Sequence, residues 1–141
     1  MDIDFEIIGE PASAKNQRRI VKYGGKPRLI KSKKALDYSK AFHQQCPKLD
    51  ELIDTDVSLR IDVWYGSRRP DLACADLIMD LLQGSIYEND RQVKGVMSLW
   101  NLDRENPRCR IRLKILKDGE DSQGLSSFRL SEIWGESGFL D

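Results

Sequence analysis

One stretch of this chain alternates apolar residues with polar or aromatic ones. The apolar residues are Val57, Leu59, Ile61 and Val63. The residues between and after them are Ser58, Arg60, Asp62 and Trp64. A period of two is typical of a β-strand, because successive side chains point to opposite faces of a sheet. After three further residues, the sequence reads Arg68-Arg69-Pro70-Asp71. We therefore expect a sheet with an acid just beyond a strand end, where open α/β sheets commonly hold their functional sites.

Four aspartates lie within twenty residues: Asp71, Asp76, Asp80 and Asp90. The pattern predicts a helix over 73–83 with Gly84 as its stop, so that Ala73, Asp76 and Asp80 share one face. Asp71 would then cap the helix, and Asp90 would return on the following loop. Clustered carboxylates repel one another and need a cation, and oxygen ligands select Mg²⁺ or Mn²⁺. The spacing also allows a plainer interpretation, in which Asp71 is a cap and the others form a solvated acidic face.

Positive charge is concentrated in one part of the chain. Residues 15–40 hold ten Lys or Arg and a single acid, Asp37, a net charge of +9 in a chain whose total is zero. A basic lobe on an acidic body predicts one surface that meets a polyanion and another that chelates metal. A solvated basic surface is the alternative, because charge runs often have no partner.

The residues around the aspartates resemble the RusA-type Holliday-junction resolvases, a family of phage and prophage endonucleases. The resemblance covers roughly residues 5–116. The matching segments, in the expected order, are Gly9-Glu10-Pro11-Ala12-Ser13-Ala14-Lys15-Asn16-Gln17-Arg18-Arg19, Ser32-Lys33-Lys34-Ala35-Leu36-Asp37-Tyr38, Pro70-Asp71-Leu72, Asp80-Leu81-Leu82 and Asn89-Asp90-Arg91-Gln92. Arg68 and Arg69 suit a site where a phosphate meets a metal.

The chain departs from the family pattern at several positions. Ala73 stands where the family usually has its second aspartate, and Asn89 replaces the first member of an Asp-Asp pair. The segment from Asp71 to Asp80 is one residue shorter than the pattern, and its helix lysine is missing. Either Asp76 supplies the missing carboxylate from the next turn of the helix, or Ala73 marks a disabled site.

The rest of the sequence predicts an α/β (α+β) fold: a single RusA-like domain over 1–116 with a mixed β-sheet packed by two helices, then a linker and tail over 117–141. Strands are expected near 3–7, 57–64, 93–102 and 109–115, with a loop or hairpin over 18–30 around Gly24-Gly25. A helix should run from Ser32 to about Gln45 and end before Pro47. Its expected inner residues are Ala35, Leu36, Tyr38 and Phe42.

Composition limits where the protein works. No apolar run approaches the roughly 20 residues of a membrane span. Three scattered cysteines and one histidine indicate reduced thiols rather than a zinc site. We expect a cytoplasmic protein of a bacterial host or of a phage-infected cell, with no membrane partner.

Two functions are consistent with these patterns. The first is a Mg²⁺-dependent endonuclease, with Mn²⁺ as a substitute, that resolves Holliday junctions (four-way branched DNA) in recombination and repair. Its catalytic and metal-binding candidates are Asp71, Asp76, Asp80 and Asp90, and its DNA-binding candidates are Lys15, Arg18, Arg19, Lys22, Arg28, Lys33, Lys34, Arg68 and Arg69. A homodimer is expected, because a two-fold symmetric junction needs two matched cuts. The second is a catalytically degenerate branched-DNA-binding protein on the same fold.

Overall fold

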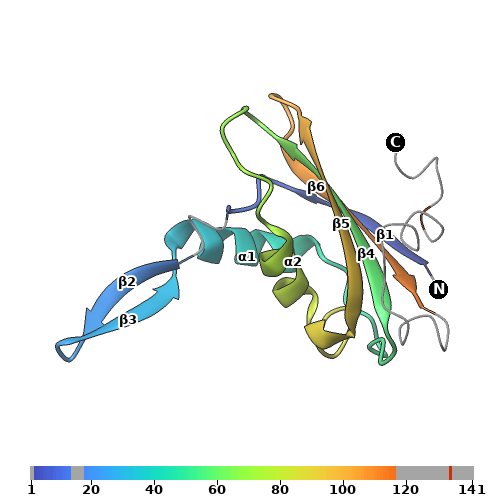
Figure 1. Cartoon of the computed structure of the whole chain (residues 1–141), viewed down its shortest axis with the longest axis horizontal. Coiled ribbons are helices and arrows are strands. Elements are labelled where there is room, and N and C mark those ends of the chain that lie inside the picture. Colours follow the sequence, from blue (N-terminus) through green and yellow to red (C-terminus); the bar gives the residue numbers. More distant parts are fainter. Residues whose placement is uncertain (1, 14–17, 117–133, 135–141) are drawn as a thin grey trace.

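The computed structural model describes residues 2–13, 18–116 and 134, and in the two hairpin strands it describes the backbone alone. The elements follow the predicted order (Figure 1). They are β1 (Asp2–Ile8), β2 (Arg18–Tyr23), β3 (Lys26–Lys31), α1 (Lys33–Gln45), β4 (Val57–Tyr65), α2 (Ala75–Leu82), the 3₁₀ turn η2 (Asp90–Gln92), β5 (Val93–Leu102) and β6 (Arg108–Ile115).

Four of the strands form one mixed sheet in the order β1-β6-β4-β5. β4 pairs in parallel with β5 and antiparallel with β6, and β6 pairs antiparallel with β1. Helices α1 and α2 both lie on the same side of this sheet (Figure 1). This arrangement confirms the predicted α+β class with a mixed sheet and two helices.

β5 carries one extra residue near its start. Val57 pairs with Val93, but Ser58 pairs with Gly95, so Lys94 is passed over in a β-bulge. From there the register runs unbroken to the pairs Val63 with Trp100 and Tyr65 with Leu102. Because paired residues share a face of the sheet, Trp100 lies on the same face as Val63 and Tyr65.

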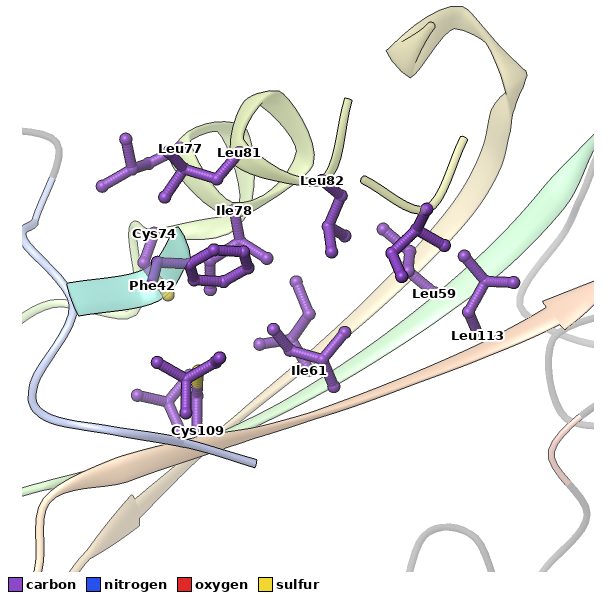
Figure 2. Packing of buried hydrophobic residues seen from close by; sticks show 14 of the residues in the cluster. Phe42, Leu59, Ile61, Cys74, Leu77, Ile78, Leu81, Leu82, Cys109 and Leu113 are labelled. Carbon is purple, nitrogen blue, oxygen red and sulfur yellow. The ribbon is translucent and has the colours of Figure 1, made fainter. Parts of the chain in front are cut away.

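The core lies between the helices and the inner face of the sheet. Figure 2 shows apolar side chains of α2, with Phe42 of α1, gathered over Leu59 and Ile61 of β4. The α2 residues Leu77, Ile78, Leu81 and Leu82 are all buried. Burial of each such side chain stabilises the fold by about 1.5–3 kcal/mol. α2 is therefore fixed on the sheet by the face opposite its aspartates.

β4 is also buried on its outer face, where its polar residues lie. Arg60 and Asp62 are 0% and 1% exposed. They form an ion pair of 3.0 Å, and Arg112 of β6 contacts the same Asp62 at 2.8 Å. Ser58, also buried, accepts a 3.2 Å hydrogen bond from the indole N–H of Trp134. Buried charges are tolerated only when they are paired in this way. β4 is therefore buried on both faces of the sheet.

Helix α1 begins and ends where the sequence predicts. The Ser32 side chain accepts from the Ala35 N–H at its start, and the helix ends at Gln45, two residues before Pro47. Three of its four expected inner residues are buried, but Leu36 is 44% exposed. That prediction was wrong, because Leu36 follows Ala35 by 100° around the helix and so points past the edge of the buried stripe.

Strands β2 and β3 form the predicted hairpin. Tyr23 pairs with Lys26 across Gly24 and Gly25, which both have positive φ angles (58° and 81°). Such two-residue turns need φ values that glycine adopts without a Cβ clash. The hairpin projects from the start of α1, away from the four-stranded sheet (Figure 1). Within the described residues, neither helix is long and apolar enough to cross a membrane.

Candidate active site

Asp71 lies at a cleft of about 640 Å³ between three separate segments of the chain. The walls come from the Gly9–Ser13 region, from α1 and from the turn that follows β4. The charged residues that line the cleft are Glu10, Lys34, Asp37, Arg69 and Asp71. Two cationic and three carboxylate side chains therefore line the same cleft. The two cations, Arg69 and Lys34, are both among the residues predicted to contact DNA.

The backbone of Asp71 is held from β4 and β5. The hydroxyl of Tyr65, at the end of β4, donates to the Asp71 carbonyl at 3.1 Å. The indole N–H of Trp100, on β5, donates to the Pro70 carbonyl, also at 3.1 Å. The two rings stack with centroids 5.8 Å apart. The turn that carries the acid thus rests on two aromatic side chains.

Asp71 does not cap α2, contrary to the prediction. The helix begins at Ala75, and its N-cap position is Cys74, which makes no side-chain capping bond. The Asp71 carbonyl accepts the Ala73 N–H at 2.9 Å as well as the Tyr65 hydroxyl, so the chain turns here before it becomes helical. Ala73 is therefore outside the helix and does not share a face with Asp76 and Asp80.

Glu10 ties the amino-terminal segment to the start of the same turn. Its Oε1 accepts a 2.9 Å hydrogen bond from the Gly66 N–H, and the Gly9 N–H donates to the Pro107 carbonyl. A Cβ on Gly66 would lie 3.1 Å from the Pro107 ring, a tight contact that the ring would have to relieve by a small shift. Glycine at this position therefore favours the close approach of the amino-terminal segment, whose residue Glu10 lines the cleft.

The other three aspartates lie on or just beyond α2. Asp76 and Asp80 are exposed, and they follow one another at helical spacing of four residues. Gln83 connects Asp80 with Asp90: its Nε2 donates to Asp80 Oδ1 at 3.3 Å, and its Oε1 accepts from the Asp90 N–H at 2.8 Å. Burial, followed by the charges of Asp90 and Asp80, raises the pKa of Tyr87, which places both carboxylates near that phenol.

Asp90 is presented by a small, well-bonded turn. Asn89 accepts from the Arg91 N–H, and the Gln92 side chain accepts from the Asn89 N–H, which completes a capping box. Gln92 also donates to the carbonyls of Ile53 and Thr55, at 2.7 and 2.8 Å. The Asn89 and Gln92 side chains thus fix the turn that carries Asp90.

The chain was compared with models of known protein families. The model described as Endodeoxyribonuclease RusA matches residues 9–114, which include the cleft, α2 and the Asp90 turn. The chain belongs to the RusA family. Among curated proteins, none matches it. RusA membership identifies the protein as an endodeoxyribonuclease of the Holliday-junction resolvase type.

The contacts of the RusA candidate acids differ from one acid to the next. Asp80 and Asp90 meet through Gln83 at the end of α2, whereas Asp71 lies in the cleft with Arg69 and Lys34. Asp76 lies in the first turn of α2, where an acid also interacts favourably with the helix dipole. Across residues 2–13, 18–116 and 134, no three His, Cys, Asp or Glu side chains are arranged to hold a metal ion.

The structure describes the side chains of only some of the predicted DNA-binding residues. Arg68, Lys33 and Lys34 are exposed, as is Arg69 in the cleft wall. Only the backbone is described for the hairpin residues Arg18, Arg19, Lys22 and Arg28, and Lys15 lies outside the described residues.

Sequence reasoning missed the residues that support Asp71. Glu10 stood inside a family motif, but its partner Gly66 is 56 residues away, and Trp100 is 30 residues from Pro70. Trp100 lies in the strand expected over 93–102, yet a strand prediction does not show where its indole N–H bonds. The cysteines are free, as expected, and burial raises the pKa of Cys109 to about 12, so this thiol is not a nucleophile at neutral pH.

Proposed function

We propose that this protein is a Mg²⁺-dependent endonuclease that resolves four-way DNA junctions, with Mn²⁺ as a working substitute. The observation that carries the proposal is Asp71 in the cleft beside Arg69 and Lys34. A carboxylate suits a hard cation, and neighbouring guanidinium and ammonium groups suit the phosphate to be cut. We place the reaction in recombination and repair, in the cytoplasm of a bacterial host or of a phage-infected cell.

The acids present fit magnesium by their chemistry. Asp71, Asp76, Asp80 and Asp90 offer only oxygen atoms, which Mg²⁺ prefers. A preformed set of three carboxylates is not required, because Mg²⁺ keeps several waters and commonly uses one or two carboxylates together with substrate phosphate. Asp71 and Asp90 would be the ligands, with Asp76 and Asp80 completing the site or supporting it. A bound ion of this kind lowers the pKa of a coordinated water and neutralises charge on the phosphate.

The protein side chains would orient the DNA backbone. Arg69 can donate two parallel hydrogen bonds to one phosphate, and Lys34 of α1 adds a second positive charge to the lining of the cleft. The basic hairpin and the start of α1 would extend this contact along the DNA. We propose phosphate contacts for Lys15, Arg18, Arg19, Lys22, Arg28, Lys33, Lys34 and Arg68.

Nicking of a synthetic four-way junction tests the proposal. Purified protein is incubated with the labelled junction and Mg²⁺, with Mn²⁺, or with EDTA, and the products are separated on a denaturing gel. We expect paired nicks with either metal and none with EDTA. Equal cleavage of a linear duplex of the same sequence would contradict junction selectivity, and cleavage in EDTA would contradict the metal requirement.

Ala73 favours a second candidate function. An alanine at an expected carboxylate position removes one ligand, and a degenerate member of the family could bind branched DNA without cutting it. Such a protein would shift the junction in a native gel with submicromolar affinity and leave it intact with either metal. A junction that is both bound and nicked rules this alternative out.

We also propose that the working form is a homodimer. A four-way junction presents two equivalent strands for cutting, and a two-fold symmetric dimer supplies two equivalent sites. Sedimentation equilibrium across micromolar concentrations should give twice the chain mass of 16.2 kDa. A mass that stays at one chain throughout would contradict the dimer and, with it, coordinated cutting.

A further inference from the structure

Two aromatic donors converge on consecutive carbonyls in the turn that carries Asp71. Trp100 bonds the Pro70 carbonyl and Tyr65 bonds the Asp71 carbonyl, each at 3.1 Å. The rings stack at an angle of 29°, so neither ring can rotate without displacing the other. Side chains of β4 and β5 thus hold the two peptide groups on either side of the Asp71 Cα.

The segment between β4 and α2 is held at several points by contacts with the rest of the domain. Residues 66–74 belong to no helix or strand. Glu10 fixes the segment at Gly66, and the two aromatic residues fix it at Pro70 and Asp71. Tyr65 is fully buried, so its ring is held in the core while its hydroxyl reaches the turn.

We infer that Tyr65 and Trp100 are positioning residues for the reaction. They fix the Asp71 carboxylate in the cleft by holding the Pro70 and Asp71 carbonyls, which flank the Asp71 Cα. We call these two donors the clamp. This inference rests on the proposed function, in which Asp71 acts on the phosphate. Neither ring needs to touch DNA or metal. A misplacement of about 1 Å in a reacting group can lower a rate about 100-fold, so a clamp of this kind has a measurable effect on catalysis.

The variants Tyr65→Phe and Trp100→Phe remove the donors and keep the rings. Trp134→Phe is the control, because it also loses an indole N–H bond, to Ser58, but on the outer face of the sheet and away from the Asp71 turn. We expect Tyr65→Phe and Trp100→Phe to cut the junction roughly ten- to a hundred-fold more slowly in single turnovers. Their junction affinity should stay within about twofold of wild type, because no DNA contact is lost. Trp134→Phe should cut at the wild-type rate.

A second measurement reports on the turn without cleavage. The Ala73 N–H donates to the Asp71 carbonyl, so its hydrogen exchange reports local opening of the turn. Exchange should be faster in Tyr65→Phe and Trp100→Phe and unchanged in Trp134→Phe.

The outcomes separate the clamp from the proposed function. Wild-type cleavage with unchanged rates in both clamp variants overturns the inference alone. If the wild type never cuts, faster Ala73 exchange in Tyr65→Phe and Trp100→Phe upholds the clamp as a structural device and overturns both its catalytic role and the proposed function. Equal loss of activity in Trp134→Phe would show a general destabilisation and overturn the positioning role.

Discussion

The two ends of α2 present acids in different ways. Before the helix, Tyr65 of β4 bonds the Asp71 carbonyl and Trp100 of β5 bonds the Pro70 carbonyl, so two strands of the sheet set the position of Asp71. At the end of the helix, Asp80 and Asp90 are joined by one side chain, Gln83. The turn that carries Asp90 is held in addition by the Gln92 bonds to the carbonyls of Ile53 and Thr55. Asp71 is the acid that lines the cleft with Arg69 and Lys34, and we expect it to dominate the chemistry.

Replacing each acid by its amide tests that expectation with the largest effect. Asp71→Asn keeps the shape of the side chain but removes its charge. Since metal-assisted charge stabilisation is worth several kcal/mol and each 1.4 kcal/mol is tenfold in rate, cleavage should fall about 100-fold or more. Junction binding should survive or tighten, because repulsion of the phosphate is relieved. Gel assays of rate and affinity on the same samples provide the measurement.

Asp90→Asn sharpens the comparison. A comparable loss would show that both ends of α2 contribute to one site, whereas normal cutting by Asp90→Asn would restrict the chemistry to the cleft. Normal cutting by Asp71→Asn would contradict the assignment of Asp71 itself.

Asp76 and Ala73 test whether the helix compensates for a missing ligand. We expect Asp76→Ala to lower Mg²⁺-dependent nicking about ten- to a hundred-fold, the usual cost of losing a group that supports a metal. Ala73→Asp should then change little, because Asp76 already supplies the charge. The reverse pattern, with cleavage greatly raised by Ala73→Asp and unaffected by Asp76→Ala, would show that the natural site is disabled.

The basic hairpin lies apart from both ends of α2 and should affect binding alone. Arg18→Glu and Arg19→Glu should each flatten the plot of log affinity against log salt by about one unit, since each phosphate contact releases about one counterion. Lys48→Glu, an exposed residue outside the basic lobe, is the control. An unchanged slope in both hairpin variants would indicate a solvated surface. A changed single-turnover rate at saturating protein would place the hairpin in the catalytic site.

Gln83→Ala should have the smallest effect. It removes the connection between Asp80 and Asp90, but the capping box of Asn89 and Gln92 still holds the turn. We expect a loss of about 1 kcal/mol in unfolding free energy and a rate within about tenfold of wild type. Gln44→Ala, exposed on α1, gives the baseline for losing an amide. A loss as large as that of Asp71→Asn would make Gln83 as important as the clamp and would contradict the ranking of the two ends.

Local pattern was sufficient for most of the fold. The alternation predicted β4 to within one residue, the strand over 93–102 was predicted as observed, and the Ser32 cap placed the start of α1. The start of α2 was predicted two residues early, because Asp71 resembles a cap in sequence while its carbonyl is already bonded by Tyr65. That bond, like those of Trp100 and Glu10, joins residues whose proximity is set by the sheet. Motifs therefore identified the acids, and only the three-dimensional structure showed what supports them.

The bulge at Lys94 determines which residues of β5 face the helices and which face outward. If Lys94 paired regularly with Ser58 instead of being passed over, Trp100 would pair with Trp64 instead of Val63, and its indole would point to the outer face of the sheet. The same strand begins directly after the Asp90 turn. One residue inserted or deleted between Gly95 and Trp100 would therefore either turn Trp100 away from the Asp71 turn or displace the Asp90 turn by about 3.3 Å along the sheet. The length of β5 thus connects the position of Asp90 with that of Asp71.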